Sequence, residues 1–212
     1  MSRRWRTIPL AALTATMMLP ATAGVTRAAP DWPPSNDIVV GEVVTGGPTG
    51  SDEYFEVYNG ADLPVQLDGL EVVYATATGN TVTTKHRWSN RQLRPGGHLL
   101  LANADGSFAG IADHTYSGGL SAAGGSLVLR VVGGAVIDSL SWGTAASAFV
   151  EGSPGAAPPA AASLERLPGG SGGNGRDTND NAADTVQNMM PIPDGSPATP
   201  ELTPEPTPEP TP

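Results

Sequence analysis

Residues 126–142 read SLVLRVVGGAVIDSLSW, and this stretch decides the fold. Two runs rich in apolar and β-branched residues, 126–132 and 135–142, flank Gly133-Gly134. A Gly-Gly pair between two such runs is a signal for a β-hairpin with a two-residue turn. The stretch therefore predicts two antiparallel strands joined by a tight turn.

Outward from this hairpin, the chain carries further short runs of strand-forming residues that end at Gly, Pro or Asn. They are residues 38–44, 54–58, 65–78, 81–88 and 98–102. Short strands at regular intervals, with turn residues between them and no segment of helical period, are typical of a sandwich or barrel. The sequence predicts an all-β domain.

The punctuating residues predict particular turns and a particular core. Asn59-Gly60 is expected to adopt positive φ, Pro95-Gly96 fits the centre of a type II turn, and Gly69 marks a bulge or a close backbone approach. The expected core residues are Val39, Val43, Phe55, Val57, Leu67, Leu70, Val72, Leu99, Leu101, Leu127, Leu129, Ile137, Leu140 and Trp142.

Composition excludes several classes of protein. The 212 residues include 27 Gly and 21 Pro, which disfavour a long helical bundle because these are the two poorest helix formers. The chain has no Cys, which excludes a disulfide scaffold and any Cys-ligated metal site. The hydrophobic share of 39% is too high for a wholly disordered chain and fits one compact domain.

The first 28 residues are expected to be a secretory signal peptide. A basic start, Arg3-Arg4-Trp5-Arg6, precedes an apolar run and then small residues up to Ala28. The alternative is a membrane-spanning helix, which Pro9 and Pro20 interrupt. Residues 29–36 form a short lead. We expect a secreted or cell-surface protein with no transmembrane segment after signal removal.

Charge argues against nucleic acid as a partner. The signal contains four of the 11 basic residues and no acidic one, so the mature chain keeps 7 basic and 21 acidic residues, a net charge of −14. Binding to a phosphate backbone needs clustered Lys and Arg. The nearest thing to a basic patch is the short stretch from Lys85 to Arg94.

The chain changes character after residue 145. Residues 146–196 are rich in Gly, Ala and Pro, and within them residues 162–167 are expected to form one edge strand. Residues 177–184, DTNDNAAD, make an acidic loop. Residues 197–212 contain Thr-Pro-Glu-Pro repeats, which predict a disordered, extended linker.

An ordered set of segments resembles the lamin-tail domain of secreted bacterial proteins. The segments are Glu42, EVYN at 56–59, VQLDGL at 65–70, LRPGGHLLL at 93–101 and VIDSLSWG at 136–143, with SLER at 163–166, the acidic loop and PIP at 191–193 trailing. The resemblance places the domain at residues 37–145. It implies an immunoglobulin-like β-sandwich without enzymatic activity. Similar domains contact other proteins in nuclear lamins, where DNA binding has also been ascribed to them, and serve as accessory modules in bacteria.

The acidic loop is the one candidate ligand site. Asp177, Asn179 and Asn181 have the D-x-N-x-N spacing of the first half of a calcium loop, and Asp184 adds an oxygen, although the second half of the pattern is missing. The alternative is that these side chains cap turns. Gly169 to Gly173 matches G-x-S-x-G, but its flanks predict no strand and helix, so we expect no catalytic residues and no cofactor other than possible calcium.

These observations lead to one expected function and two alternatives. The expected function is a secreted, non-catalytic module for adhesion or scaffolding that binds a protein or a cell-surface polymer. The first alternative is a glycan-binding module that uses exposed tryptophans, with Trp88 the best candidate among Trp32, Trp88 and Trp142. The second is an accessory domain of a hydrolase whose catalytic part is absent from this chain.

Overall fold

The structure is a computed structural model that describes residues 30–195. The expected signal peptide, residues 1–28, and the expected linker, residues 197–212, lie outside the described residues. Within the described part of the chain, no helix is long and apolar enough to cross a membrane.

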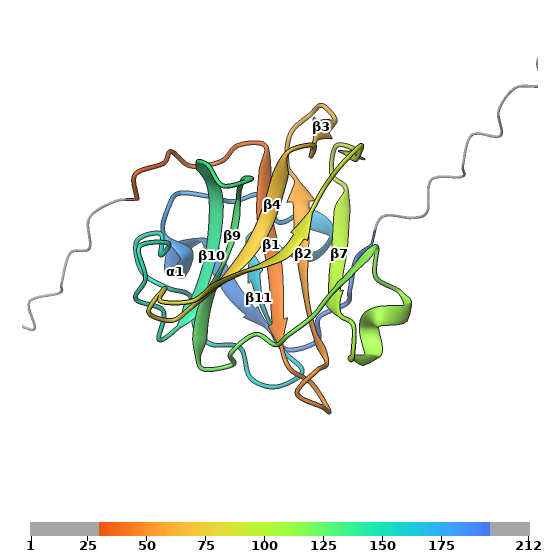
Figure 1. Ribbon diagram of the computed structural model, residues 1–212, viewed down its shortest axis with the longest axis vertical. Coiled ribbons are helices and arrows are strands. Elements are labelled where there is room, and N and C mark those ends of the chain that lie inside the picture. The colour runs from red at the N-terminus through yellow and green to blue at the C-terminus, as the bar shows by residue number, and fades with distance from the viewer. Residues whose placement is uncertain (1–29, 196–212) are drawn as a thin grey trace, which may run out of the picture.

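Two sheets pack face to face, and β10, β9 and β4 cross in front of β1, β2 and β11 in Figure 1. The six-stranded sheet contains, in spatial order, β12 (Thr185–Asn188), β11 (Ser163–Arg166), β1 (Ile38–Thr45), β2 (Glu53–Asn59), β7 (His98–Asn103) and β8 (His114–Tyr116). The four-stranded sheet contains β10 (Val136–Gly143), β9 (Gly124–Val131), β4 (Leu70–Thr76) and β5 (Val82–Arg87). The expected immunoglobulin-like β-sandwich is confirmed.

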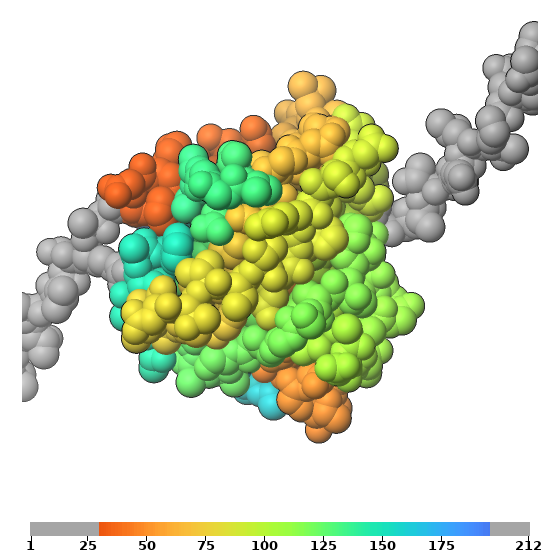
Figure 2. Space-filling model, in the orientation of Figure 1, coloured from red at the N-terminus to blue at the C-terminus, as the bar shows by residue number. Residues whose placement is uncertain are grey.

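The remaining elements are short. They are the two-stranded sheet of β3 (Val65–Gln66) and β6 (Gln92–Leu93), the 3-10 turns η1 (Ser107–Gly110) and η2 (Gly170–Gly172), and the one-turn helix α1 (Asn181–Asp184). All neighbours in the two large sheets are antiparallel except β7 and β8. The chain from β4 to β5, yellow in Figure 2, occupies much of the face toward the viewer.

The core lies between the sheets. Phe55 and Leu101 from the six-stranded sheet meet Leu129, Leu140 and Trp142 from the four-stranded sheet, and all five are fully buried. Each such side chain contributes roughly 1.5–3 kcal/mol to folding. All but three of the expected core residues belong to this buried cluster; Leu70 and Ile137 are partly buried and pack against it.

The third exception, Val39, is buried outside that cluster, and a β-bulge explains why. Val40 pairs with Val57 but Glu42 pairs with Glu56, so Gly41 is an extra residue in β1. An extra residue reverses the alternation of side chains. Val40 therefore faces the core, whereas Glu42 faces outward.

The predicted hairpin of β9 and β10 has a longer loop than expected. Four residues, 132–135, lie between β9 and β10, and Val131 N–H donates to Ala135 O at 3.0 Å. Gly133, with φ of 65°, occupies the position that needs a left-handed backbone. The hairpin is confirmed, and the two-residue turn is wrong.

Of two other predicted turns, the structure confirms one and contradicts the other. Gly96 has φ of 63°, and Gly97 N–H donates to Arg94 O at 3.0 Å, as a type II turn requires. Neither Asn59 nor Gly60 has positive φ, so that expectation is wrong. The buried Asn59 amide instead donates to Leu63 O and Leu93 O, at 3.0 and 2.9 Å, and fixes the chain after β2.

The trailing segment is part of the sandwich. β11 lies between β1 and β12, so the expected edge strand at 162–167 is an inner strand. The edge is β12, whose sequence TVQN carries too little apolar pattern to predict a strand. The segment after residue 145 therefore completes the six-stranded sheet.

Candidate functional site

Three glutamates form a row across the outer face of the six-stranded sheet. Glu42 of β1 pairs with Glu56 of β2 on one side and with Glu165 of β11 on the other. All three are buried, with exposed fractions of 4%, 2% and 7%. The bulge at Gly41 places Glu42 in this row, and a Cβ at Gly41 would lie 2.9 Å from Asn174 Cβ, so the close approach requires glycine.

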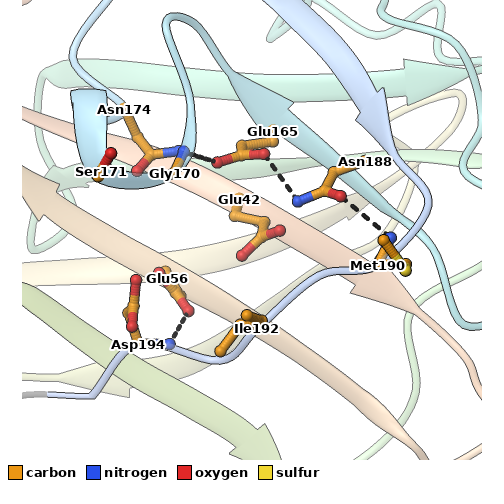
Figure 3. A pocket seen from close by; sticks show the side chains of 10 residues that line it. All are labelled: Glu42, Glu56, Glu165, Gly170, Ser171, Asn174, Asn188, Met190, Ile192 and Asp194. Carbon is orange, nitrogen blue, oxygen red and sulfur yellow. Dashed lines mark hydrogen bonds between the residues drawn. The ribbon is translucent and has the colours of Figure 1, made fainter.

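This row lines a cavity of about 310 Å³, which we call the Glu42 cavity (Figure 3). Its lining residues are Glu42, Glu56, Glu165, Gly170, Ser171, Asn174, Asn188, Met190, Ile192 and Asp194. The chain that follows β12 passes along one side of the cavity and contributes Met190, Ile192 and Asp194. The cavity therefore has acidic and apolar walls.

Two of the glutamates have several hydrogen-bond donors. Glu165 accepts from Gly170 N–H at 2.6 Å and from the side-chain amides of Asn174 and Asn188, both at 3.0 Å. Glu56 accepts from Asp194 N–H at 2.6 Å and lies 2.8 Å from His98 Nδ1. Burial raises the pKa of Glu56, and the hydrogen bond with His98 opposes this shift.

Glu42 is different, because within residues 30–195 no N–H group donates to its carboxylate. The hydroxyls of Ser163 and Tyr54 lie beside it. Burial, together with the negative charge of Glu56, raises the pKa of Glu42 to about 8. A buried carboxylate without an N–H donor or a cation is costly to ionise. Glu42 thus differs from Glu56 and Glu165, because hydroxyl groups, and no amide of the described chain, lie beside its carboxylate.

Metal ligation fits only part of this site. The side chains of Glu56, His98 and Asp194 offer ligand atoms within 4.8 Å of one another, and Glu42 does not belong to that group. Both Glu56 oxygens already have the contacts described above. A second group in the described chain, Asp138, Glu151 and Asp177, surrounds an arginine.

That arginine, Arg166 of β11, is fully buried and links the trailing segment to the core domain. Its Nη2 lies 2.6 Å from Asp138 Oδ1 and 3.2 Å from Glu151 Oε2. Its Nε donates to Val40 O at 3.1 Å. Burial raises the pKa of Asp138 and of Glu151, and the positive charge of Arg166 opposes both shifts.

Of the four residues of the expected calcium loop, the two aspartates lie beside this arginine and the two asparagines have other partners. Asp177 Oδ1 and Asp184 Oδ2 lie 3.6 and 3.7 Å from Arg166 Nη1. Asn181 accepts from Ser141 N–H at 2.9 Å, and the Asn179 amide donates to Trp32 O at 2.8 Å.

Turn capping describes much of this geometry. Asp177 accepts from the N–H of Asn179, two residues on, at 2.9 Å, and Asp184 accepts from Thr178 N–H at 2.6 Å. The structure thus brings the two aspartates to one cation but turns the two asparagines elsewhere. Calcium binding by the four residues stays a prediction, and its test is given below.

The aromatic platform expected for glycan binding does not form from the tryptophans that the structure describes. Trp88 is 4% exposed and belongs to the core, so its expected exposure is wrong. Trp142 is fully buried. Trp32 is partly buried and donates from Nε1 to Glu151 Oε1 at 2.9 Å. The G-x-S-x-G match lies in η2, a single 3-10 turn and not the strand-to-helix elbow of a nucleophile.

Sequence reasoning missed the Glu42 cavity, although a signal for it exists. Glu42 and Glu56 each interrupt a run of β-branched and aromatic residues, IVVGEVV and YFEVY. A charged residue inside a buried strand pattern is unusual and indicates a buried polar site. The bulge that brings the two side chains to one face has no comparable signature.

The chain belongs to the lamin tail domain family. The family model described as Lamin Tail Domain matches residues 33–144, which is more than half of the chain. Domains of this family are typically non-catalytic. No curated protein matches the chain.

A solved structure shows the same fold. The crystal structure of a DUF4876 family protein from Bacteroides thetaiotaomicron VPI-5482 is 15% identical, with a TM-score of 0.54. The match covers 74% of this chain and 72% of that one. Because the identity is low, the likeness describes the fold alone.

Proposed function

We propose that this protein is a secreted or cell-surface, non-catalytic module for adhesion or scaffolding, whose partner is a protein or a cell-surface polymer. Family membership supports a domain that serves as a module. The observation that carries the proposal is an exposed apolar patch. Of the nine large hydrophobic side chains exposed on the described chain, four lie between residues 186 and 192.

These four side chains, Val186, Met189, Met190 and Ile192, are here called the 186–192 patch. Their exposed fractions are 45%, 64%, 83% and 76%. The patch adjoins edge strand β12, and two of its members line the Glu42 cavity. Clustered apolar exposure beside a cavity is typical of an interaction surface.

The basic stretch from Lys85 to Arg94 offers little to nucleic acid. Lys85 is buried and donates to the carbonyls of Ser117, Gly118 and Gly119. Arg87 pairs with Glu71 at 2.8 Å. Burial of Lys85 and the pairing of Arg87 with Glu71 leave less accessible positive charge for a phosphate backbone in this stretch.

Capture from the native surface fraction tests the proposal. The mature protein is immobilised, and bound material is compared with that on a heat-unfolded sample. We expect a partner that only the folded protein retains at physiological ionic strength. Identical retention by folded and unfolded protein would contradict the module function.

Export is tested separately by N-terminal sequencing of the protein recovered outside the cell. We expect cleavage after Ala28, with Ala23 as the second choice. A product that begins at Met1 or Ser2 would contradict the proposed localisation.

A further inference from the structure

We propose that the Glu42 cavity binds a primary ammonium group carried on an aliphatic chain, namely a lysine side chain of a partner protein. The proposal rests on the module function above and names the chemistry that this surface recognises. It is carried by a buried carboxylate that no N–H group of the described chain contacts, the size of the cavity and its apolar wall.

The first observation is that no N–H group of the described chain donates to the Glu42 carboxylate. Its neighbours Glu56 and Glu165 accept hydrogen bonds from amides at 2.6–3.0 Å, whereas Glu42 accepts none from an N–H group of the described chain. The charges that act on Glu42 are those of Glu56, Glu165 and Asp194, all negative. A cation that enters from outside would therefore gain from these three charges and would supply the N–H donors that Glu42 lacks.

The second observation is size. Oxygens that share one calcium ion lie 2.3–2.6 Å from it and hence within about 5 Å of one another. Glu42 is in no group of described residues that meets such a spacing, and the cavity, at about 310 Å³, is wide for a bare ion. An ammonium group with its alkyl chain suits this space better.

The third observation is the apolar wall. Met190 and Ile192 line the cavity and are also largely exposed. A lysine buries its methylene stem along apolar surface while its charged head reaches a polar group. The same cavity offers both contacts, with carboxylates from β1, β2 and β11 and the two apolar side chains along one side (Figure 3).

The test is titration of the mature protein with methylammonium, n-butylammonium and N-acetyl-lysine methylamide, followed by NMR. We expect saturable shifts at residues around the cavity, with affinity rising from methyl- to butylammonium. Glu42→Gln keeps the shape of the side chain but removes its charge, and it should weaken butylammonium binding about tenfold or more. Ile192→Ser, at an exposed position, should remove the preference for the longer chain.

The matched control is Glu53→Gln. Glu53 is another buried glutamate of β2 with a pKa raised by burial, but it faces away from the cavity and accepts from Asn103 and Leu120 N–H. This variant should bind butylammonium like the wild type. Thermal melts of all variants verify that each is folded.

Ionisation gives an independent readout. The ammonium pairs with charged Glu42, so binding should strengthen as pH rises toward 8 while Lys, with a pKa near 10.4, stays protonated. Glu56, Glu165, Asp194 and, behind Glu56, His98 are the other titratable groups here. Glu42→Gln should lack most of this pH dependence.

Three results would overturn the inference: no amine binding at millimolar concentration, equal binding by wild type and Glu42→Gln, or displacement of the amines by calcium with no chain-length preference. If a captured partner is retained equally by wild type and Glu42→Gln, the lysine site is wrong and the module function stands. If wild type captures no partner, the module function itself fails.

Discussion

Arg166 shows how one side chain can hold a family domain and its trailing segment together. It is fully buried, and its guanidinium contacts Asp138, Glu151 and the carbonyl of Val40. Removing one partner of a buried ion pair leaves an uncompensated charge. We therefore expect the loss of Arg166 to lower the free energy of unfolding more than the loss of an exposed arginine does.

Arg166→Met should lower the free energy of unfolding by about 3–5 kcal/mol, because Asp138 and Glu151 lose their buried cation. Urea unfolding followed by tryptophan fluorescence measures the loss. Arg91→Met, at a partly exposed pair with Asp113, is the control and should cost about 0–1 kcal/mol. Equal losses in the two variants would show that the Arg166 cluster adds nothing special.

Glu42 should give the folded protein a pH-dependent stability. Its pKa is raised from 4.5 to about 8, so the folded state keeps a proton that the unfolded chain releases. The favourable contribution is full below pH 4.5 and is lost as pH rises through 8, at roughly 1.4 kcal/mol for each pKa unit. The contribution of Glu42 to the free energy of unfolding of the wild type therefore falls between pH 4.5 and about pH 8.

Glu42→Gln removes this titration, so its melting temperature relative to wild type should rise between about pH 5 and pH 8. Carboxylates remote from Glu42 titrate alike in both proteins, so the difference reports on Glu42 and on the carboxylates coupled to it, Glu56, Glu165 and Asp194. The check is calorimetry of both proteins at the two pH values. A constant difference between them would mean that Glu42 titrates normally.

At the scale of elements, the trailing segment is structural. β11 pairs with β1 along Glu42, Val43 and Val44, and β12 pairs with β11. A chain that ends at residue 144, the end of the family match, would expose the edge of β1 and leave Asp138 without Arg166. Sheet edges and unpaired buried charges are both destabilising.

Residues 30–144 should therefore lack the fixed tertiary packing that residues 30–195 possess. Near-ultraviolet circular dichroism and NMR dispersion of the two chains provide the comparison. A dispersed spectrum from the shorter chain would show that the trailing segment is an appendage.

The acidic loop is tested by a thermal melt in millimolar calcium and in chelator. Because Arg166 already lies beside Asp177 and Asp184, and the two asparagines bond elsewhere, the turn-capping alternative predicts equal melting temperatures. A rise in calcium that Asp177→Ala abolishes would establish calcium at these residues. A rise that survives Asp177→Ala would place the ion elsewhere.

The sequence predicts the elements that have a repeating pattern and misses those that depend on distant partners. Among β1 to β10, the strands with an apolar pattern can be predicted from the sequence, because one face of each packs on the core. β12 is not, since TVQN becomes a strand only by pairing with β11. The bulge at Gly41 is also not predictable, because it is defined by the register of β1 against β2 and not by the sequence of β1 alone.

The residues of the candidate sites also fall into those that the sequence predicts and those that it does not. Asp177 and Asp184 are recognisable as a pair of oxygen donors, but the cation beside them is Arg166, which sequence spacing does not reveal. The Glu42 cavity combines three strands and the chain after β12, so no single segment contains it.

At the scale of the whole molecule, the two sheets have different outer surfaces. The six-stranded sheet carries the carboxylate row, the cavity and the 186–192 patch at its β12 side. The four-stranded sheet ends at β5, where Val82 is 41% exposed and does not line the Glu42 cavity. We therefore propose that the partner binds the first surface.

Site-specific photo-crosslinking tests this assignment most directly. A photoreactive residue is placed at position 192 or, as control, at position 82, and each protein is irradiated with the native surface fraction. We predict a discrete adduct from position 192 and none from position 82. An adduct from position 82 alone, or equal adducts from both, would contradict it.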